Sequence, residues 1–199
     1  GSGKSVTSLS IMGLLQHPGR VVDGEIFFQD QDILSYGKRR MRRVRGKEIA
    51  MIFQDPMTSL NPVYTVGNQI MEMLQEHEDI GKGEAKRRAI EMLRMVGIPS
   101  PEKRIHNYPH EFSGGQRQRI GIARSLVVKP SVIIADEPVS ALDVSIQAQV
   151  INLLMDIKKE MDLTILFIAH NLAVVKYFSD RIGVMHFGTM VELADADEL

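Results

Sequence analysis

The 199-residue chain contains no cysteine, which excludes disulfides, iron–sulfur clusters and cysteine-ligated zinc and suits a reducing compartment. Lysine and arginine total 24 against 25 acidic residues, and the resulting net charge of −1 argues against a general affinity for nucleic acid or lipid. Hydrophobic residues make up 44% of the chain, enough to bury a core. No apolar run approaches the ~20 residues that span a bilayer, so we expect any membrane role to be peripheral.

The first residues, Gly1 to Ser5, read GSGKS, which is the second half of the phosphate-binding pattern G-x-x-x-x-G-K-[ST]. Glycines in this pattern let backbone N–H groups point at phosphate oxygens. Lys4 can reach the β and γ phosphates, and the Ser5 hydroxyl can bind Mg²⁺. An apolar helix follows, and its positive N-terminal end faces the same phosphates. The leading glycine of the pattern would lie before residue 1, so we expect the chain to begin inside a longer loop.

A second signal lies at the end of the apolar run Val132 to Ala135, which is followed by Asp136 and Glu137. Such a run is typical of a buried strand, and open α/β sheets bind their ligands at the carboxyl ends of strands. One carboxylate there can support the water shell of a metal while the other faces a nucleophile. Acidic residues also end strands simply because they meet water, so this pair depends on its neighbours for its interpretation.

The segment Phe112 to Gln116, with the sequence FSGGQ, supplies one such neighbour. Ser113 is a good helix N-cap, and the two glycines after it leave backbone N–H groups open at the start of an apolar-periodic helix. The pattern predicts a second anion site at a helix N-terminus. Taken alone, the pentapeptide also fits an ordinary capped helix.

Two further polar residues follow apolar runs. Gln54 comes after residues 49–53, and His170 comes after residues 164–169, which we expect to form another buried strand. Gln54 can bind Mg²⁺ through its carbonyl oxygen and hold a water through its amide. The His170 imidazole can hydrogen-bond a γ-phosphate and orient an attacking water. Outside this context, each would be an ordinary solvated residue at the end of a strand.

Three stretches lie outside these signals. Residues 38–47 are strongly basic, and because no aromatics are interleaved we expect a solvated helix rather than a nucleic-acid site. Residues 66–109 repeat apolar side chains at helical spacing and predict a helical insert. His106 and His110 lie on the polar connector at its end, without an obvious partner, and neither is assigned a catalytic role. Residues 182–192 suggest a closing β-hairpin.

Taken in order, GSGKS, Gln54 in MIFQDP, FSGGQRQR, VIIADEP, SALD and His170 in FIAHN resemble the motif set of ABC-transporter ATPase subunits, over essentially the whole chain. More narrowly, FQDPMTSLNP, NYPHEFSGGQRQRIGIARSL and ALDVSIQAQV resemble the subunits of bacterial oligopeptide, dipeptide and nickel importers. The resemblance implies an α/β fold, a P-loop NTPase core with a mainly parallel sheet and an inserted helical subdomain. Residues 1–64 and 126–199 would form the core and residues 65–125 the insert. Most of the family's antiparallel β subdomain, with its adenine-stacking aromatic, would lie before residue 1.

The resemblance also implies an ATP site that uses Mg²⁺. Its nucleotide-binding residues would be Gly1, Ser2, Gly3, Lys4, Ser5, Val6, Ser113, Gly114, Gly115, Gln116 and Asp143. Its metal-binding residues would be Ser5, Gln54 and Asp136, and its catalytic residues Glu137, His170 and Gln54. Glu137 would be the general base for the attacking water, and His170 would stabilise the γ-phosphate. Ser113 and Gly115 would complete the site of a second subunit in a head-to-tail dimer, with Asp143 communicating between the two ATP sites.

The implied function is the ATP-hydrolysing subunit of a bacterial importer, specifically one for oligopeptides or dipeptides. Its partners would be a second ATPase subunit, two transmembrane permease subunits and, indirectly, a substrate-binding protein, at the cytoplasmic face of the inner membrane and without nucleic acid. The front half resembles one ATPase of the oligopeptide permease pair and the back half the other, so homodimer and heterodimer both stay open. The alternatives are a soluble ABC-type ATPase in DNA repair or translation, which FQDPMTSLNP and the modest insert disfavour, and a non-catalytic regulator, which the presence of Glu137 and His170 disfavours.

Overall fold

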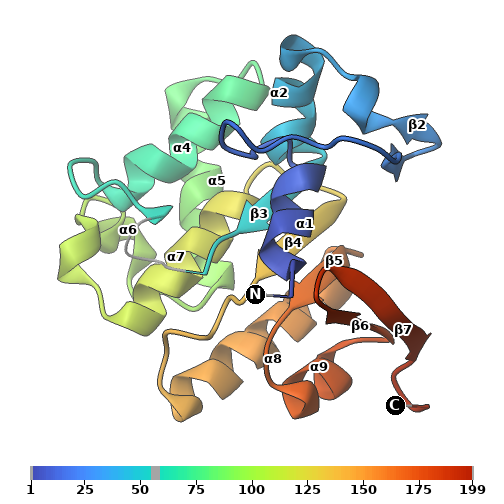
Figure 1. Ribbon diagram of the computed structural model, residues 1–199. Helices are drawn as coiled ribbons and strands as arrows, with labels where there is room; N and C mark the ends of the chain where they lie inside the picture. The colour runs from blue at the N-terminus through green and yellow to red at the C-terminus, as the bar shows by residue number, and fades with distance from the viewer. Residues whose placement is uncertain (1, 55–58, 199) are drawn as a thin grey trace.

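A three-stranded parallel sheet lies at the centre of the computed structural model, which describes residues 2–54 and 59–198 (Figure 1). Its strand order is β3–β4–β5, with β4 in the middle. The strands span Ile49–Ile52 (β3), Val132–Asp136 (β4) and Thr164–Ile168 (β5). The pairing is parallel on both sides of β4, so the carboxyl ends of all three strands meet at one edge.

Helices cover both faces of this sheet. One face packs against α1 (Lys4–Ile11) and α2 (Lys38–Lys47). The described residues also form α4 (Val66–His77), α5 (Lys82–Met95), α6 (Pro101–Arg104), α7 (Gly114–Leu126), α8 (Val144–Glu160) and α9 (Leu172–Phe178). Short 3₁₀ turns span Ile33–Ser35 (η1) and Pro109–Glu111 (η2).

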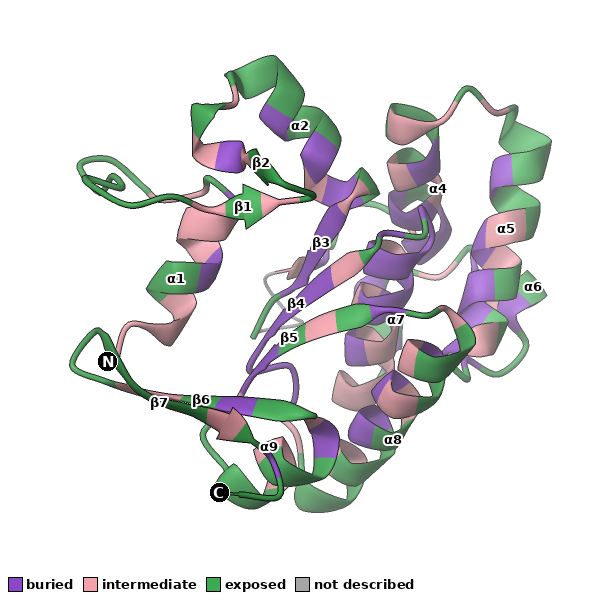
Figure 2. Cartoon of the chain, turned by 90° about the vertical axis from the view of Figure 1, so that its right-hand side faces the viewer, coloured by how far each residue is buried: buried purple, intermediate pink, exposed green. Residues whose placement is uncertain are grey.

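β3 and β4 alternate their side chains between two apolar cores. Ala50 and Ile133 face the larger core, which α4, α5, α7 and α8 complete. Met51 and Ile134 face a smaller core built with residues of α1 and α2. A strand covered on both faces needs an apolar residue at every position, which is why these strands are continuous apolar runs in the sequence. Figure 2 shows both strands almost entirely in the colour of buried residues.

β5 differs from the buried strand that we expected over residues 164–169. It ends at Ile168, and only Phe167 and Ile168 are buried, whereas Leu166 is 41% exposed. The reason is its position, because β5 pairs with β4 on one side and lies at the edge of the described sheet. The first half of β5 is accordingly pink and green in Figure 2.

Residues 66–109 are mostly helical, as their apolar periodicity predicted; the division into a core of 1–64 and 126–199 and an insert of 65–125 stays a prediction. α4 begins where Thr65 accepts a hydrogen bond from the amide of Asn68 at 3.2 Å. The amide of Gly67 donates to the carbonyl of Ile105 at 2.9 Å. A Cβ on Gly67 would lie 2.6 Å from that carbonyl oxygen, so the close approach requires glycine.

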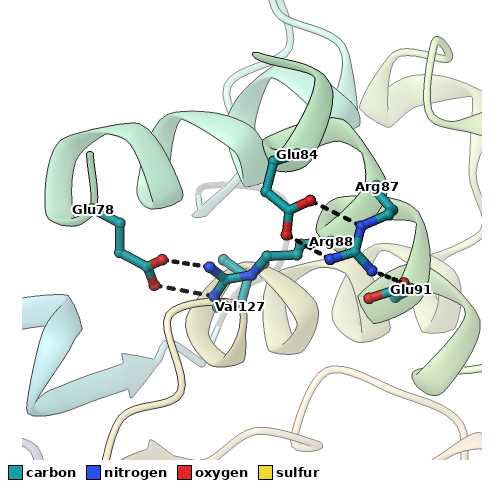
Figure 3. Close-up of polar contacts among 6 residues, drawn as sticks. All are labelled: Glu78, Glu84, Arg87, Arg88, Glu91 and Val127. Atoms are coloured by element: carbon teal, nitrogen blue, oxygen red, sulfur yellow. Dashed lines mark hydrogen bonds and ion pairs between the residues drawn. The ribbon is translucent and has the colours of Figure 1, made fainter. Parts of the chain in front are cut away.

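Arg88 of α5 joins the ends of two other helices (Figure 3). Its guanidinium contacts both carboxylate oxygens of Glu78, just after α4, and donates to the carbonyl of Val127, just after α7, at 3.0 Å. The two charged side chains are only 20% and 27% exposed, so this bidentate pair is less screened than a surface pair. The hydrogen bond from Arg88 is the main reason that the pKa of Glu78 is lowered. Figure 3 also shows an exposed neighbouring cluster, formed by Arg87, Glu84 and Glu91.

Two small antiparallel sheets flank the core. The first pairs Phe27–Phe28 (β1) with Gln31–Asp32 (β2), and the left-handed residues Gln29 and Asp30 turn the chain back between them. The predicted closing hairpin is confirmed as β6 (Arg181–His186) and β7 (Thr189–Asp195). Across residues 2–54 and 59–198, no helix is both long enough and apolar enough to cross a membrane.

Candidate functional site

Three predicted residues meet at the carboxyl edge of the sheet. Glu137, which directly follows β4, is only 7% exposed. Its Oε2 accepts a hydrogen bond from Gln54 Nε2 at 2.9 Å, and its Oε1 lies 2.5 Å from His170 Nε2. Gln54 follows β3 and His170 follows β5, so the parallel register of the sheet brings together residues from three distant parts of the chain.

The backbone of Glu137 holds its carboxylate between these two neighbours. Its φ of 49° lies in the left-handed region, which is uncommon for a residue with a side chain. The amide of Glu137 donates to the carbonyl of Ile168 at 2.9 Å, and its carbonyl accepts from the amide and hydroxyl of Ser140 at 3.2 and 3.1 Å. Sequence reasoning assigned no role to Ser140 or Ile168, although Ser140 lies in the SALD motif.

Ser5 and Asp136 form a second polar contact beside the first. The Ser5 hydroxyl donates to Asp136 Oδ1 at 3.1 Å, across 131 residues of sequence. Hydroxyl and carboxylate oxygens are the ligands that Mg²⁺ prefers, so this pair fits the predicted metal role. Within the described residues, no group of three or more His, Cys, Asp or Glu side chains is placed to hold a metal. A metal here would therefore need other oxygen ligands, such as those of Ser5 and Gln54.

The phosphate loop is supported by the β6–β7 turn. Gly1 lies outside the described residues, but Gly3 caps α1 with a φ of 94°, which favours glycine. The carbonyl of Ser2 accepts from the amide of Gly188 at 3.1 Å, and its hydroxyl accepts from Lys4 Nζ at 3.1 Å. The predicted Val6 follows on α1 with an exposed side chain. Sequence reasoning missed Gly188, because a glycine in a hairpin turn carries no sign of what the turn will contact.

The FSGGQ helix start is a capping box on the surface. The Ser113 hydroxyl accepts from the amide of Gln116 at 3.3 Å, and Gln116 Oε1 accepts from the amide of Ser113 at 3.2 Å. Gly114 and Gly115 open α7, and a Cβ on Gly115 would lie only 2.6 Å from Cγ2 of Ile146 in α8. The helix start therefore packs beside the exposed N-cap of α8, the predicted Asp143.

The predicted site residues thus fall into two groups. Ser5, Gln54, Asp136, Glu137 and His170 meet at the sheet edge, next to Lys4 at the start of α1. The second group is the FSGGQ helix start and Asp143. Among the hydrogen bonds and ion pairs of the described residues, none joins the second group to the first.

Comparison with known proteins assigns this arrangement to a family. Residues 1–140 match the family model described as ABC transporter. The chain belongs to the ABC transporter family. It is 54% identical over 200 aligned positions to the oligopeptide transport ATP-binding protein OppD of Bacillus subtilis, covering 100% of this chain and 56% of OppD. It is 50% identical to the dipeptide transport ATP-binding protein DppD of Haemophilus influenzae, covering 100% of this chain and 60% of DppD. This ABC transporter chain therefore spans less than two thirds of the length of these relatives.

Solved structures of ABC cassettes confirm the predicted fold. A dimeric ATP-binding cassette in a post-hydrolysis state, bound to ADP and Pi, superposes with a TM-score of 0.84 at 26% identity, covering 98% of this chain and 81% of that one. The cbiO1 protein of Clostridium perfringens, part of an ABC transporter complex, superposes with a TM-score of 0.84 at 27% identity, covering 99% and 74%.

The ABC transporter chain also has a groove of about 840 Å³ whose lining includes Phe53, the residue directly before Gln54. Phe53, residues 59–62 and Tyr64 line one part of it, and residues of β3, α2, α4 and α7, with Met12 and Leu14 after α1, line the rest. Gln69 of α4, only 4% exposed, shapes this wall. Its amide donates to the carbonyls of Asn61 and Tyr64 at 2.9 and 3.0 Å and accepts from the amide of Asn61 at 2.9 Å. The groove is therefore bounded by a loop that a satisfied buried amide holds in place, and we call it the Gln54 groove.

Proposed function

We propose that this chain is the ATP-hydrolysing part of a bacterial peptide importer. The observation that carries the proposal is the carboxylate of Glu137, buried and held between Gln54 and His170 at the sheet edge that also holds Ser5 and Asp136. Peptide import is supported by the names of the relatives OppD and DppD, with which the chain shares about half of its residues.

In this proposal each residue has a chemical task. Lys4 and the loop amides bind the β and γ phosphates of ATP. Glu137 accepts a proton from the attacking water, and His170 donates a hydrogen bond to the γ-phosphate. Mg²⁺, when bound, neutralises charge on the phosphates, and Ser5, Gln54 and Asp136 supply the oxygens that fit it. The products are ADP and inorganic phosphate.

We propose that the FSGGQ group acts on the ATP of a second subunit. Ser113, Asp143 and Val144 are exposed at one surface, and the Val144 side chain is 82% accessible. A helix start with open amides seeks an anion, and within this chain the FSGGQ helix start shares no described polar contact with the Glu137 group. A head-to-tail partner would bring a γ-phosphate to it, and whether that partner is an identical or a different chain is left to experiment.

Mixing two inactive variants tests this dimer. Ser113→Arg should spare ATP binding by the monomer and abolish ATP-dependent dimers formed with Glu137→Gln, because a bulky cation would block the shared phosphate pocket. In a homodimer, Ser113→Arg chains mixed with Lys4→Ala chains should regain one working composite site per pair. Light scattering with and without ATP, and turnover of the mixture, measure both effects. An unchanged ATP-dependent dimer of the arginine variant would exclude the shared site.

We further propose that the Gln54 groove receives a cytoplasmic helix of the permease. Phe53 and residues 59–62 line the groove, so an occupant would contact the residue directly before Gln54, a predicted catalytic side chain. Tyr64, which lines the groove, is 53% exposed and offers an aromatic anchor of the kind enriched at interfaces. Through this contact the ATPase would work peripherally, at the cytoplasmic face of the membrane.

Reconstitution tests the function as a whole. The full-length protein is purified with two permease subunits in proteoliposomes, and uptake of labelled dipeptides and oligopeptides is measured with ATP supplied on the ATPase side. We expect uptake that requires ATP, vanishes in Glu137→Gln and falls in Tyr64→Ala. Tyr177→Ala, a change at another exposed tyrosine, on α9, should leave uptake intact. An ATP hydrolysis rate that the permease does not change, together with no peptide uptake, would refute the proposed importer function.

A further inference from the structure

The proposed mechanism does not use a hollow of about 1060 Å³ that lies between α2 and the end of α4. We call it the basic basin. Its lining includes five basic side chains of α2, namely Arg39, Arg40, Arg42, Arg43 and Lys47. The last turn of α4, with Glu76 and His77, forms the opposite wall.

The fold displays these charges outward. Met41 and Val44, each 6% exposed, attach α2 to the smaller core, so the positions between and around them face solvent. Like charges three and four residues apart destabilise a helix, and Arg39 stands in that relation to both Arg42 and Arg43. A surface helix with no further role would be expected to intersperse acidic residues, but α2 contains none.

The charges of the basin are also largely uncompensated. None of the ion pairs within the described residues involves the five basic side chains. Arg40 is engaged with neutral groups, since it contacts Gln31 Oε1 and lies 3.7 Å from the centre of the Tyr36 ring. The two carboxylates of the lining, Glu48 and Glu76, are outnumbered by the five bases. In a chain whose net charge is −1, this is a local concentration of positive charge.

The basic basin continues from the Gln54 groove. Arg45 and Gly46 of α2 and Met73 of α4 line the groove. Lys47, the next residue of α2, and His77, one turn further along α4, line the basin. The helices touch at the boundary, because a Cβ on Gly46 would lie 2.7 Å from His77 Nε2. A segment seated in the groove therefore has the basin directly beyond its end.

We propose that the basic basin binds an acidic peptide segment of the same membrane-embedded partner that occupies the Gln54 groove. Arginine forks match carboxylates in a bidentate manner, and five bases at one surface would attract several of them. The concave shape admits a peptide chain, whereas a flat bilayer would reach only its rim. None of the described residues that line it is Trp, Tyr or Phe, so nucleic-acid bases would find no stacking platform. The partner's identity rests on the proposed function; the preference for carboxylates does not.

Binding of a labelled hexaglutamate peptide to the full-length protein tests the chemistry. Fluorescence anisotropy should show an affinity that falls as NaCl is raised from about 50 to about 300 mM, because salt screens the attraction between the exposed basic side chains and the peptide carboxylates. The triple variant Arg39→Glu/Arg42→Glu/Arg43→Glu should bind at least about tenfold more weakly. A matched variant, Lys82→Glu/Lys103→Glu/Lys159→Glu, reverses three exposed charges on α5, α6 and α8 and should change the affinity by less than about twofold.

Competing ligands give the results that would overturn the proposal. Equal weakening by the two triple variants would mean that only the overall charge matters. Phosphatidylglycerol vesicles or an RNA dodecamer that bind through the three arginines, when hexaglutamate does not, would replace the acidic peptide by a lipid or a nucleic acid. Inorganic phosphate that displaces hexaglutamate better than chloride at equal ionic strength would indicate a phosphate site. Circular dichroism of both variants, expected to match the unmodified protein, confirms that they fold.

Assembly with the permease separates this inference from the proposed function. We expect the arginine triple variant to bind the purified permease subunits at least about tenfold more weakly while its own ATP hydrolysis is unchanged. If the unmodified protein does not bind the permease at all, the proposed function fails, and the hexaglutamate result decides the nature of the basin by itself. If it binds and the arginine variant binds equally well, the inference fails and the function stands.

Discussion

Replacing Glu137 by Gln tests the centre of the proposed site with little change of shape. The amide has the size of the carboxylate and can still hydrogen-bond Gln54, which lies 2.9 Å away, and His170, which lies 2.5 Å away. What it loses is the negative charge and the ability to accept a proton from water. The substitution therefore separates general-base catalysis from ATP binding and from folding.

A general base contributes about 10²- to 10⁴-fold to a rate, so hydrolysis should fall by that factor, equivalent to about 2.7 to 5.5 kcal/mol of transition-state stabilisation. ATP affinity should stay near normal, because in the proposed mechanism Lys4 and the loop amides, not Glu137, bind the phosphates. Ser140→Ala is a graded companion. It removes one of the two hydrogen bonds from Ser140 to the carbonyl of Glu137 and should cost about tenfold or less.

Single-turnover hydrolysis and equilibrium ATP binding by the full-length, assembled protein measure the two effects separately. Asp136→Asn is the control for the neighbouring carboxylate, and it should weaken the dependence of activity on Mg²⁺ concentration as well as lower the rate. Near-normal turnover by Glu137→Gln would show that another group accepts the proton. A large loss of ATP affinity with an unchanged rate for bound ATP would make Glu137 a binding residue and refute the assignment.

Two further predictions concern stability. Gly67→Ala should destabilise the chain by about 1–3 kcal/mol in urea unfolding, because its Cβ would lie 2.6 Å from the backbone oxygen of Ile105. Gly83→Ala on α5, where nothing lies within 4 Å, should instead stabilise by up to about 1 kcal/mol, and equal effects at both glycines would contradict the packing argument. Glu78→Gln should cost about 1 kcal/mol at pH 7, since the hydrogen bond from Arg88 lowers the pKa of Glu78 in the folded state. A lowered pKa stabilises the fold above the unfolded value near 4.5, and this stabilisation disappears as the pH falls through the folded value, so the variant and the unmodified protein should converge in acid. A difference that persists at low pH would mean that packing, not charge, is what Glu78 contributes.

Much of the local structure could be predicted from the sequence, because it depends on neighbours along the chain. The apolar runs 49–53 and 132–135 indicated strands, since a strand covered on both faces is apolar throughout, and the structure has strands at Ile49–Ile52 and Val132–Asp136. Ser113 indicated a helix start, and its capping box with Gln116 spans only four residues. The basic residues 38–47 indicated a solvated helix, and α2 spans these same residues. The ordered motifs were sufficient for the family and the fold.

Contacts between distant residues were decided by the tertiary structure. Sequence reasoning proposed Gln54, Glu137 and His170 separately, but only the register of three parallel strands brings their side chains within hydrogen-bonding distance. The contact of Ser2 with Gly188 carried no signal in the sequence, and the SALD motif that contains Ser140 did not indicate its hydrogen bonds to the Glu137 carbonyl. The exposure of β5 was wrongly predicted for the same reason. Apolar periodicity reports which residues prefer burial, whereas the strands and helices that pack around them determine which of those residues are covered.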